Sequence, residues 1–207
     1  MYSNLPNLIL AFHGCDEETY KKVLYEHESL LPSLNSYDWL GNGIYLWENS
    51  LARAEEWAKM YCERYNKKNP DKNPKKPAVI GAVVNLGHCL DLTDYGSSEI
   101  LKNGYDILAY ELSLLGKEMP INKNVKGNND LLLRELDCAV IQRIHQFNRE
   151  VGRRSYDSVR GLFIEGKPVY KESGIMDKTH IQLCIINPNC IKGYFKPLEP
   201  NADWVIV

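Results

Sequence analysis

The first candidate for ligand chemistry is the pair His13 and Gly14, at the end of the apolar run 7–13. An imidazole in this position can donate a hydrogen bond to a sugar hydroxyl. The glycine lets a ligand come close to the backbone, which can then pair with an amide. The alternative interpretation is a core histidine that is bonded to a carbonyl group.

The second candidate is the segment 41–45, Gly-Asn-Gly-Ile-Tyr. Two glycines two positions apart allow a tight turn with positive φ, so we expect Tyr45 on a short extended segment before a helix. An aromatic ring there can stack on a planar ring, which is worth about 0.5–1.5 kcal/mol beyond its burial. A hairpin turn with a core tyrosine is the alternative.

The third candidate lies on a strand expected over 179–187. Its apolar residues alternate with polar ones, and strand geometry therefore places His180 and Gln182 on one face. Two neighbouring polar groups need partners if they are buried, and a ligand would supply them. The exposed face of an edge strand would satisfy them equally well.

The elements that must position these residues are separated strands with helices between them, which predicts an α+β fold. A parallel series with a glycine-rich first turn is not visible, which argues against a doubly wound fold. Asp16 is expected to cap the first helix. In the second helix we expect Ala54, Trp57 and Ala58 to point inward. The expected strands are 7–13, 78–86, 161–165, 179–187 and 191–195, and the expected helices are 17–31, 51–65, 98–115 and 129–150.

Size and composition indicate one well-cored domain over residues 1–207. The chain has 44% hydrophobic residues and a net charge of -2, so it has no global basic signature for nucleic acid. No apolar run reaches the roughly 18 residues of a membrane span, and no basic n-region precedes the first strand. We therefore expect a cytoplasmic protein with no membrane partner.

The six cysteines are scattered without a CxxC pair, so we expect reduced thiols and no metal site. A cysteine hydrolase that uses Cys15 and His13 is a weaker alternative, because closeness in sequence does not create a suitable dyad. The segment 66–77 holds three prolines and five lysines, and we expect an exposed connector there. A flap that faces nucleic acid is the alternative.

Three segments together resemble the motifs of the diphtheria-toxin-like and poly(ADP-ribose)-polymerase-like ADP-ribosyltransferases. The segment 8–14, Leu-Ile-Leu-Ala-Phe-His-Gly, resembles their first motif, a strand that ends in His-Gly. The segment 41–58 is similar to the second, Gly-x-Gly-x-Tyr before a helix with small residues. In the third, a catalytic glutamate opens a strand and a β-branched residue follows nine positions later, and Ile191 stands nine positions after Gln182.

The resemblance implies an ADP-ribosyltransferase-like fold, which is a split antiparallel β-sheet core with flanking and inserted helices. The stretch 97–150 matches none of the motifs and is expected as a helical insertion. The resemblance further implies that NAD is the co-substrate. Tyr45 would stack on nicotinamide and Gln182 would orient the nicotinamide ribose. The residues expected to bind NAD are His13, Gly14, Gly43 and Tyr45.

Gln182 departs from the family, whose glutamate stabilises an oxocarbenium-like transition state. An amide keeps a hydrogen bond but loses the charge, and charge-assisted bonds are roughly twice as strong. Extension into poly(ADP-ribose) is therefore disfavoured. The expected activity is mono-ADP-ribosyl transfer to a protein or nucleic-acid acceptor. The alternative is a non-catalytic module that binds NAD or ADP-ribose.

His180 is the candidate base, because Gln182 cannot take a proton. Its side chain is expected to leave the strand about 6–7 Å from that of Gln182, and an ordinary imidazole titrates near neutral pH. A structural histidine is the alternative. Small bacterial or phage transferases of this kind are often toxins or effectors, so the resemblance suggests such a role and an antitoxin as a possible partner.

Overall fold

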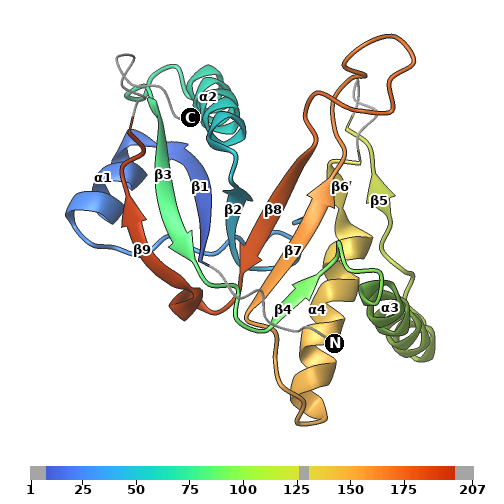
Figure 1. Cartoon of the computed structure of the whole chain (residues 1–207). Coiled ribbons are helices and arrows are strands. Elements are labelled where there is room, and N and C mark those ends of the chain that lie inside the picture. Colours follow the sequence, from blue (N-terminus) through green and yellow to red (C-terminus); the bar gives the residue numbers. More distant parts are fainter. Residues whose placement is uncertain (1–7, 126–130, 199–207) are drawn as a thin grey trace.

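The computed structural model describes residues 8–125 and 131–198 (Figure 1). In chain order its elements are β1 (Ile9–Asp16), α1 (Glu17–Tyr25), β2 (Ile44–Glu48), α2 (Leu51–Lys68), β3 (Pro77–Val84), β4 (Cys89–Asp91), α3 (Ser97–Leu114), β5 (Asn122–Lys123), β6 (Leu133–Arg134), α4 (Glu135–Glu150), β7 (Ser158–Phe163), β8 (His180–Ile185), a 3-10 turn (Pro188–Cys190) and β9 (Ile191–Phe195).

Seven of these strands form one sheet in the order β4-β7-β8-β2-β1-β3-β9, which confirms the α+β class. Neighbouring strands are antiparallel except for β4 and β7, which are parallel. The prediction of an antiparallel sheet is therefore wrong at this edge. A parallel pair needs a long crossover connection, and α3, α4 and the separate β5–β6 ladder supply it.

The strands β1 and β2 separate partway along their length. The ladder joins them at only two residue pairs, of which the second is Phe12–Trp47. Beyond that pair β1 stays paired with β3, and β2 stays paired with β8. A fork therefore opens between β1 and β2 from His13 onward.

Each face of the sheet has its own core. Ala11, Leu46 and Leu183 pack with α1 on one side, which we call the α1 face. The opposite side is the α2 face, where α2 packs on β1 and β3. On the same face Ile141 of α4 packs onto the β7 and β8 residues Val159 and Cys184. Figure 1 shows α2 at one end of the sheet and α3 and α4 at the other.

The first helix is shorter than its apolar pattern predicts. Asp16 caps it as expected, since its side chain accepts from the N–H of Thr19 at 2.9 Å. The helix ends at Tyr25 and not near residue 31, and His27 has a φ of 59°. Leu30 still reaches the core, where the hydroxyl of Tyr194 binds its N–H. The apolar residue at this position is thus buried by an irregular segment and not by the helix that its spacing predicted.

The remaining predictions agree with the structure apart from a few boundaries and short strands. The expected helix 98–115 and strand 191–195 are confirmed as α3 and β9. The last helix begins at residue 135, not 129, and residues 126–130 lie outside the described part of the chain. The strand expected over 161–165 spans 158–163. The sequence pattern did not indicate β4, β5 or β6, which have two or three residues each.

The second helix uses small residues to approach the sheet. Its buried residues are Ala54, Ala58 and Cys62. A Cβ atom on Gly14 would overlap the carbonyl oxygen of Ala54, so the helix backbone lies directly against β1. Trp57, which we expected to point inward, is 37% exposed. It lies beside the buried row, where its larger ring fits.

The segment 66–77 is more ordered than a solvated connector. The helix continues through Lys68, and β3 begins at Pro77. Between them the backbone of Lys75 makes two hydrogen bonds to the side chain of Asn66. The ammonium of Lys75 also binds Asp16 at 2.6 Å. The prediction that all five lysines only decorate the surface is therefore wrong for Lys75.

Within residues 8–125 and 131–198, no helix is long and apolar enough to cross a membrane. All six cysteines are free thiols. The same residues contain no group of three or more His, Cys, Asp or Glu side chains that could hold a metal ion.

Candidate functional site

His13 lies where the fork opens, and its ring bridges the two strands. Its Nδ1 atom is 2.8 Å from the carbonyl oxygen of Tyr45. A carbonyl only accepts, so Nδ1 carries the proton and Nε2 is left with a lone pair. Burial lowers the pKa of His13 more than this hydrogen bond raises it, so the ring is neutral at pH 7. The bond to a carbonyl is the alternative that the sequence left open, and it leaves Nε2 for a ligand.

The backbone of Gly14 faces the fork. Along a strand, the N–H and C=O groups of alternate residues point to opposite neighbours. The carbonyl of Leu10 accepts from the N–H of Asn49 at 2.9 Å, on the β2 side. The alternation therefore directs the polar groups of Gly14 to the same side, beyond the end of the β1–β2 ladder at Phe12. An amide placed in the fork can pair with them.

Tyr45 is fixed by its hydroxyl. The hydroxyl donates to the carbonyl of Gly41 at 2.7 Å and accepts from the N–H of Leu40 at 2.9 Å. Burial raises the pKa of the phenol, which therefore stays neutral. Gly41 has the expected positive φ, at 82°. Part of the ring packs in the core, as in the alternative interpretation, and part is exposed.

Gly43 has a packing role in the structure. A Cβ atom there would lie 2.6 Å from the sulfur of Cys184 and 2.7 Å from the carbonyl oxygen of Ile185. Its backbone φ angle is not positive. The glycine thus lets the turn lie against β8, and the structure gives it no position that faces the fork.

Gln182 lies on β8, directly between Trp47 of β2 and Gly161 of β7. Paired residues share a face of the sheet, so Gln182 is on the α2 face together with Tyr45. Its side chain is half-buried. Among the described residues, no hydrogen-bond partner is recorded for its amide. Its contact with a ligand stays a prediction.

His180 is on the same face but deeply buried. Only 1% of its side chain is exposed. Its Nδ1 atom is 2.7 Å from the carbonyl oxygen of Lys178 and 3.8 Å from a carboxylate oxygen of Glu165. Burial lowers the pKa of His180, and Arg53 lowers it further. This environment is that of the structural alternative, although its Nε2 atom remains without a partner.

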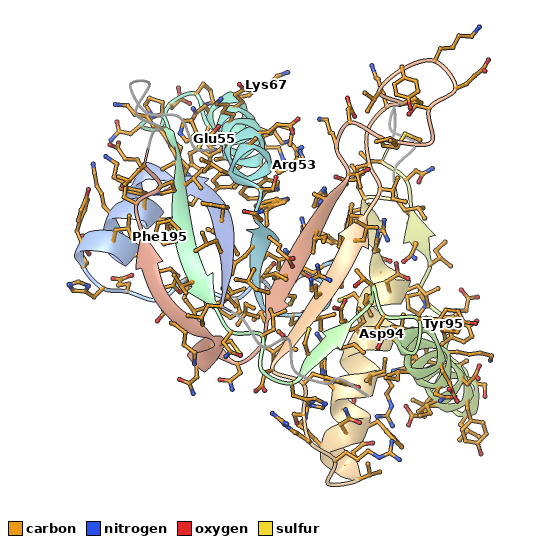
Figure 2. All side chains as sticks on the ribbon, in the orientation of Figure 1. Arg53, Glu55, Lys67, Asp94, Tyr95 and Phe195 are labelled. Carbon is orange, nitrogen blue, oxygen red and sulfur yellow. The ribbon has the colours of Figure 1, made fainter. Side chains whose placement is uncertain are left out.

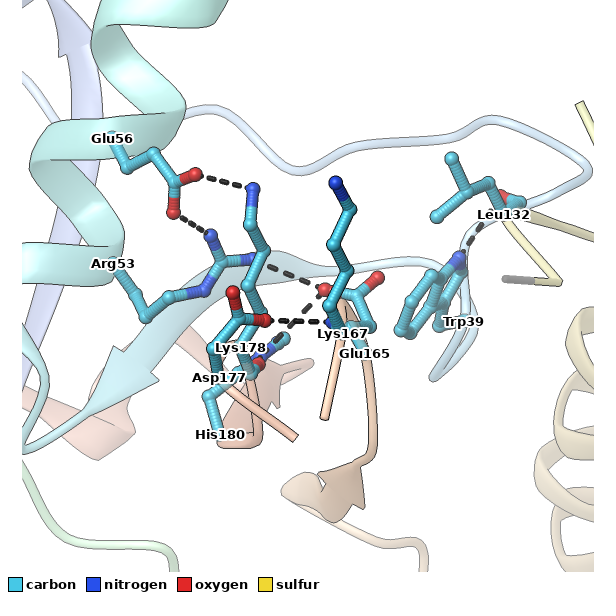
Figure 3. Close-up of polar contacts among 9 residues, drawn as sticks. All are labelled: Trp39, Arg53, Glu56, Leu132, Glu165, Lys167, Asp177, Lys178 and His180. Carbon is cyan, nitrogen blue, oxygen red and sulfur yellow. Dashed lines mark hydrogen bonds and ion pairs between the residues drawn. The ribbon is translucent and has the colours of Figure 1, made fainter. Parts of the chain in front are cut away.

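A charged network surrounds the start of β8 (Figure 3). Arg53 binds Glu56 within α2 and also binds Glu165 at 3.1 Å, just after β7. Lys178 binds Glu56 from the other side. Burial would raise the pKa of Glu56, but Lys178 and Arg53 outweigh it and lower that pKa. Sequence reasoning missed this network because the residues that bind one another are up to 122 positions apart.

Several buried polar atoms near Gln182 have no partner. Among the described residues, the buried unpaired side-chain atoms include Nε1 of Trp47, Nε of Arg53 and Nε2 of His180. Trp47 is paired with Gln182 across the ladder, and His180 is two residues before it. Unpaired buried polar atoms are uncommon in folded proteins. Two further atoms of this kind lie on α4: Nη1 of Arg143 and Nε2 of His145. Around β8, a ligand or water can complete the hydrogen bonding.

Two surface cavities lie away from these residues. One of about 450 Å³ lies between the start of α1 and residues 72–76, and another of about 230 Å³ lies between His27 and Tyr194. Neither is lined by His13, Tyr45 or Gln182. The structure thus brings His13 and Gly14 next to the backbone of Tyr45 at the fork. The register places the side chain of His13 on the α1 face, because its ladder partner Ile80 belongs to that core. The side chains of Tyr45 and Gln182 are on the α2 face.

Comparison with known proteins gives one relative and no function. No family model matches the chain. The chain is 28% identical over 217 aligned residues to the uncharacterized protein MJ0359 of Methanocaldococcus jannaschii. This likeness covers 95% of the chain and 91% of that protein. No solved structure matches.

Proposed function

We propose that this protein is a mono-ADP-ribosyltransferase with an ADP-ribosyltransferase-like fold. The observation that carries the proposal is the fork, where Gly14 lies beyond the end of the β1–β2 ladder and Nδ1 of His13 binds the carbonyl of Tyr45. Tyr45 and Gln182 follow on the next two strands, in the order that the sequence resemblance implies. A sheet that divides between β1 and β2 also suits the split core of that fold.

In this proposal NAD lies in the fork. The Gly14 backbone pairs with the nicotinamide carboxamide, and His13 contacts a ribose hydroxyl. The exposed part of the Tyr45 ring stacks on nicotinamide. The amide of Gln182 hydrogen-bonds the nicotinamide ribose. Gly43 supports the site by packing and does not touch the ligand.

The reaction breaks the bond between the ribose C1′ and the nicotinamide nitrogen. Nicotinamide leaves as a neutral molecule with the bonding electron pair, and positive charge develops on the ribose. An acceptor oxygen or nitrogen then bonds to C1′, and any proton it carried passes to water or to a base. Gln182 stabilises this charge less than a carboxylate does, so a slow reaction follows.

His180 can serve as that base only if its buried Nε2 reaches the acceptor. The described contacts hold the ring from the Nδ1 side, at Lys178 and Glu165. An acceptor that needs no deprotonation avoids this requirement. We therefore place His180 as a residue that positions the start of β8 and keep Gln182 as the residue that touches NAD.

The second candidate function is a module that binds NAD or ADP-ribose without cleaving it. The observation in its favour is that the nearby carboxylates are already engaged. Glu56 binds Arg53 and Lys178, and Glu165 binds Arg53. Neither acid stands free to replace the charge that Gln182 lacks.

Release of nicotinamide from NAD separates the two functions. A transferase releases nicotinamide slowly, and Gln182→Glu should raise the rate about tenfold, since roughly 1.4 kcal/mol of added charge stabilisation is a factor of ten. Gln146→Glu on α4 adds the same charge at an exposed position and should change nothing. NAD binding without release in the wild type and in Gln182→Glu would favour the binding module.

The biological setting follows from the proposed activity. A small transferase of this kind suits a toxin or effector role in the cytoplasm, with an antitoxin as its partner. The acceptor is then a protein or a nucleic acid of the target cell.

A further inference from the structure

The helix that follows Tyr45 carries a row of partly exposed aromatic rings. Trp57, Tyr61 and Tyr65 are four residues apart and therefore lie on one side of α2. Trp57 and Tyr61 are stacked, with ring centroids 5.3 Å apart and planes 6° apart. Trp57 also contacts Trp47, whose ladder partner is Gln182. The row thus begins at the candidate site.

The other end of the row meets a basic segment. Residues 59–76 contain seven Lys or Arg and two Asp or Glu, a net charge of +5, so the rest of the chain carries -7. The net charge of the whole chain, which is only -2, does not reveal this uneven distribution of charge. The cavity of about 450 Å³ opens beside this segment. Lys72, Lys76 and Tyr65 line one side of it, and the acidic residues Glu17 and Glu18 of α1 also line it.

Lys75 holds the segment in place. Its ammonium lies 5.1 Å from the centre of the Tyr61 ring and 4.6 Å from that of Tyr65. It also binds Asp16 at the end of β1. Burial alone would lower the pKa of Lys75, but the bonds to Asp16 and Tyr61 raise it. The remaining lysines are exposed: Lys67, Lys68, Lys72 and Lys76.

The arrangement forms a track along one helix. Arg53 lies at the site end, and Lys67 lies near the far end of α2 (Figure 2). These two residues are 14 positions apart, or about 21 Å along the axis. At the stacked spacing of roughly 3.4 Å per nucleotide, that length spans at most about six phosphates. Rings beside a basic path are the features that bind single strands without reading sequence.

We propose that α2 and residues 66–77 bind single-stranded nucleic acid and deliver it to the α2 face as the ADP-ribose acceptor. The inference rests on the proposed transferase function and names its acceptor. The exposed lysines contact phosphates, and a base stacks on the exposed part of Trp57. An acidic protein would use the lysines but would gain nothing from the stacked rings.

The test measures binding of a fluorescein-labelled single strand of about 12 nucleotides, in DNA and RNA forms. The variant replaces Lys67, Lys68, Lys72 and Lys76 with serine and leaves Lys75 intact. We expect affinity to fall at least about tenfold, and the salt slope to fall by about 3, since each phosphate contact contributes roughly 0.7. The matched control replaces four exposed lysines elsewhere: Lys102, Lys117, Lys171 and Lys192. It should bind as the wild type does.

The aromatic contribution has its own pair of variants. Trp57→Ala should weaken binding about tenfold by removing the stacking surface. Tyr110→Ala removes an exposed ring on α3 and should leave binding unchanged. The melting temperature of each variant shows whether the fold is retained. Labelled NAD should transfer its ADP-ribose to the oligonucleotide, and less so in the serine variant.

Three results would overturn the inference. They are no binding at low salt, equal weakening in the serine variant and its matched control, and labelling of lysate proteins while the oligonucleotide stays unlabelled. Nicotinamide release without any acceptor is measured in parallel. A chain that releases nicotinamide but ignores the oligonucleotide contradicts this inference alone. A chain that neither binds NAD nor releases nicotinamide contradicts the proposed function, and the acceptor role with it.

Discussion

The fork at His13 and the start of β8 at His180 fix a histidine ring by the same kind of hydrogen bond, but they differ in how exposed the residue is. In each histidine the Nδ1–H group donates a hydrogen bond to a backbone carbonyl, of Tyr45 in one case and of Lys178 in the other. Each is thereby left with a lone pair on Nε2. His13 keeps some exposed surface as a residue, although burial lowers the pKa of its ring. At β8 the side chain of His180 is almost fully enclosed beside Glu165.

The difference shows that a fixed tautomer alone does not let a histidine contact a ligand. At the fork the β1–β2 ladder has ended, so the backbone groups of β1 beyond Phe12 are not paired with β2. At β8 the ladder with β7 continues to the Phe163–His180 pair, and charged side chains close over it. Access to a ligand follows from where strand pairing stops.

The largest expected effect is a difference in unfolding free energy between alanine substitutions at a glycine of β1 and a glycine of β7. Gly14→Ala should cost at least about 3 kcal/mol of unfolding free energy, because the new methyl group meets a backbone carbonyl that cannot give way. Gly161→Ala, opposite Gln182, meets a flexible atom of Leu40 at 2.9 Å and should cost about 1 kcal/mol. Urea denaturation measures both. Equal costs would show that the fork is no more tightly packed than β8.

Acid should destabilise the protein through its buried histidines. Burial lowers the pKa of His145 to about 4 and also lowers those of His13 and His180. The folded chain thus binds fewer protons than the unfolded chain between pH 4 and 6.5. Stability is full above pH 6.5 and falls as pH drops toward 4, by on the order of 3 kcal/mol for His145 alone.

Urea titrations across this pH range test the two regions separately. His13→Gln and His180→Gln should each make the acid loss shallower, because each removes a group that must stay neutral in the fold. His145→Gln serves as a reference outside both regions. A pH profile unchanged in either variant would mean that the ring in question protonates freely in the folded protein.

The hydroxyl of Tyr45 should matter more for stability than for contact with NAD. Tyr45→Phe leaves the N–H of Leu40 without its partner and leaves the carbonyl of Gly41 with only the thiol of Cys184, at a cost of about 1–3 kcal/mol. The ring and its stacking surface remain, so NAD affinity should hold. Tyr110→Phe removes an exposed hydroxyl and is the control. A stable Tyr45→Phe variant that loses NAD binding would reverse this assignment.

The smallest expected effect concerns the outer end of β1. Lys75→Ser removes the ion pair with Asp16 and the contacts with two tyrosine rings, and should cost about 1 kcal/mol. Lys72→Ser alters an exposed side chain and should cost almost nothing. Thermal unfolding compares them. Equal melting temperatures in the two variants would show that Lys75 does not stabilise the fold and that the segment 66–77 is a simple connector.

Local pattern was enough to predict the elements that carry His13, Tyr45 and Gln182. Strand alternation placed His180 and Gln182 on one face, and the register agrees. The fork could not be predicted, because it depends on which strands stop pairing across the sheet. The same applies to the bond between Arg53 and Glu165, which spans 112 residues.

Helix periodicity also left one ambiguity. The spacing that predicted an inward Trp57 also fits a row beside the buried one, and only the close approach of Ala54 to β1 decides between them. Similarly, no local rule distinguishes Lys75 from its four neighbours. Its role depends on Asp16 and Tyr61, which come from other elements.

Calorimetric titration with NAD tests the central claim most directly. The wild type should bind NAD. His13→Gln should bind it roughly 5- to 150-fold more weakly, since a lost hydrogen bond in a buried site costs about 1–3 kcal/mol. His180→Gln should bind as the wild type does, because that ring is enclosed away from the fork. Absence of NAD binding in the wild type, or equal affinity in His13→Gln, would contradict the account.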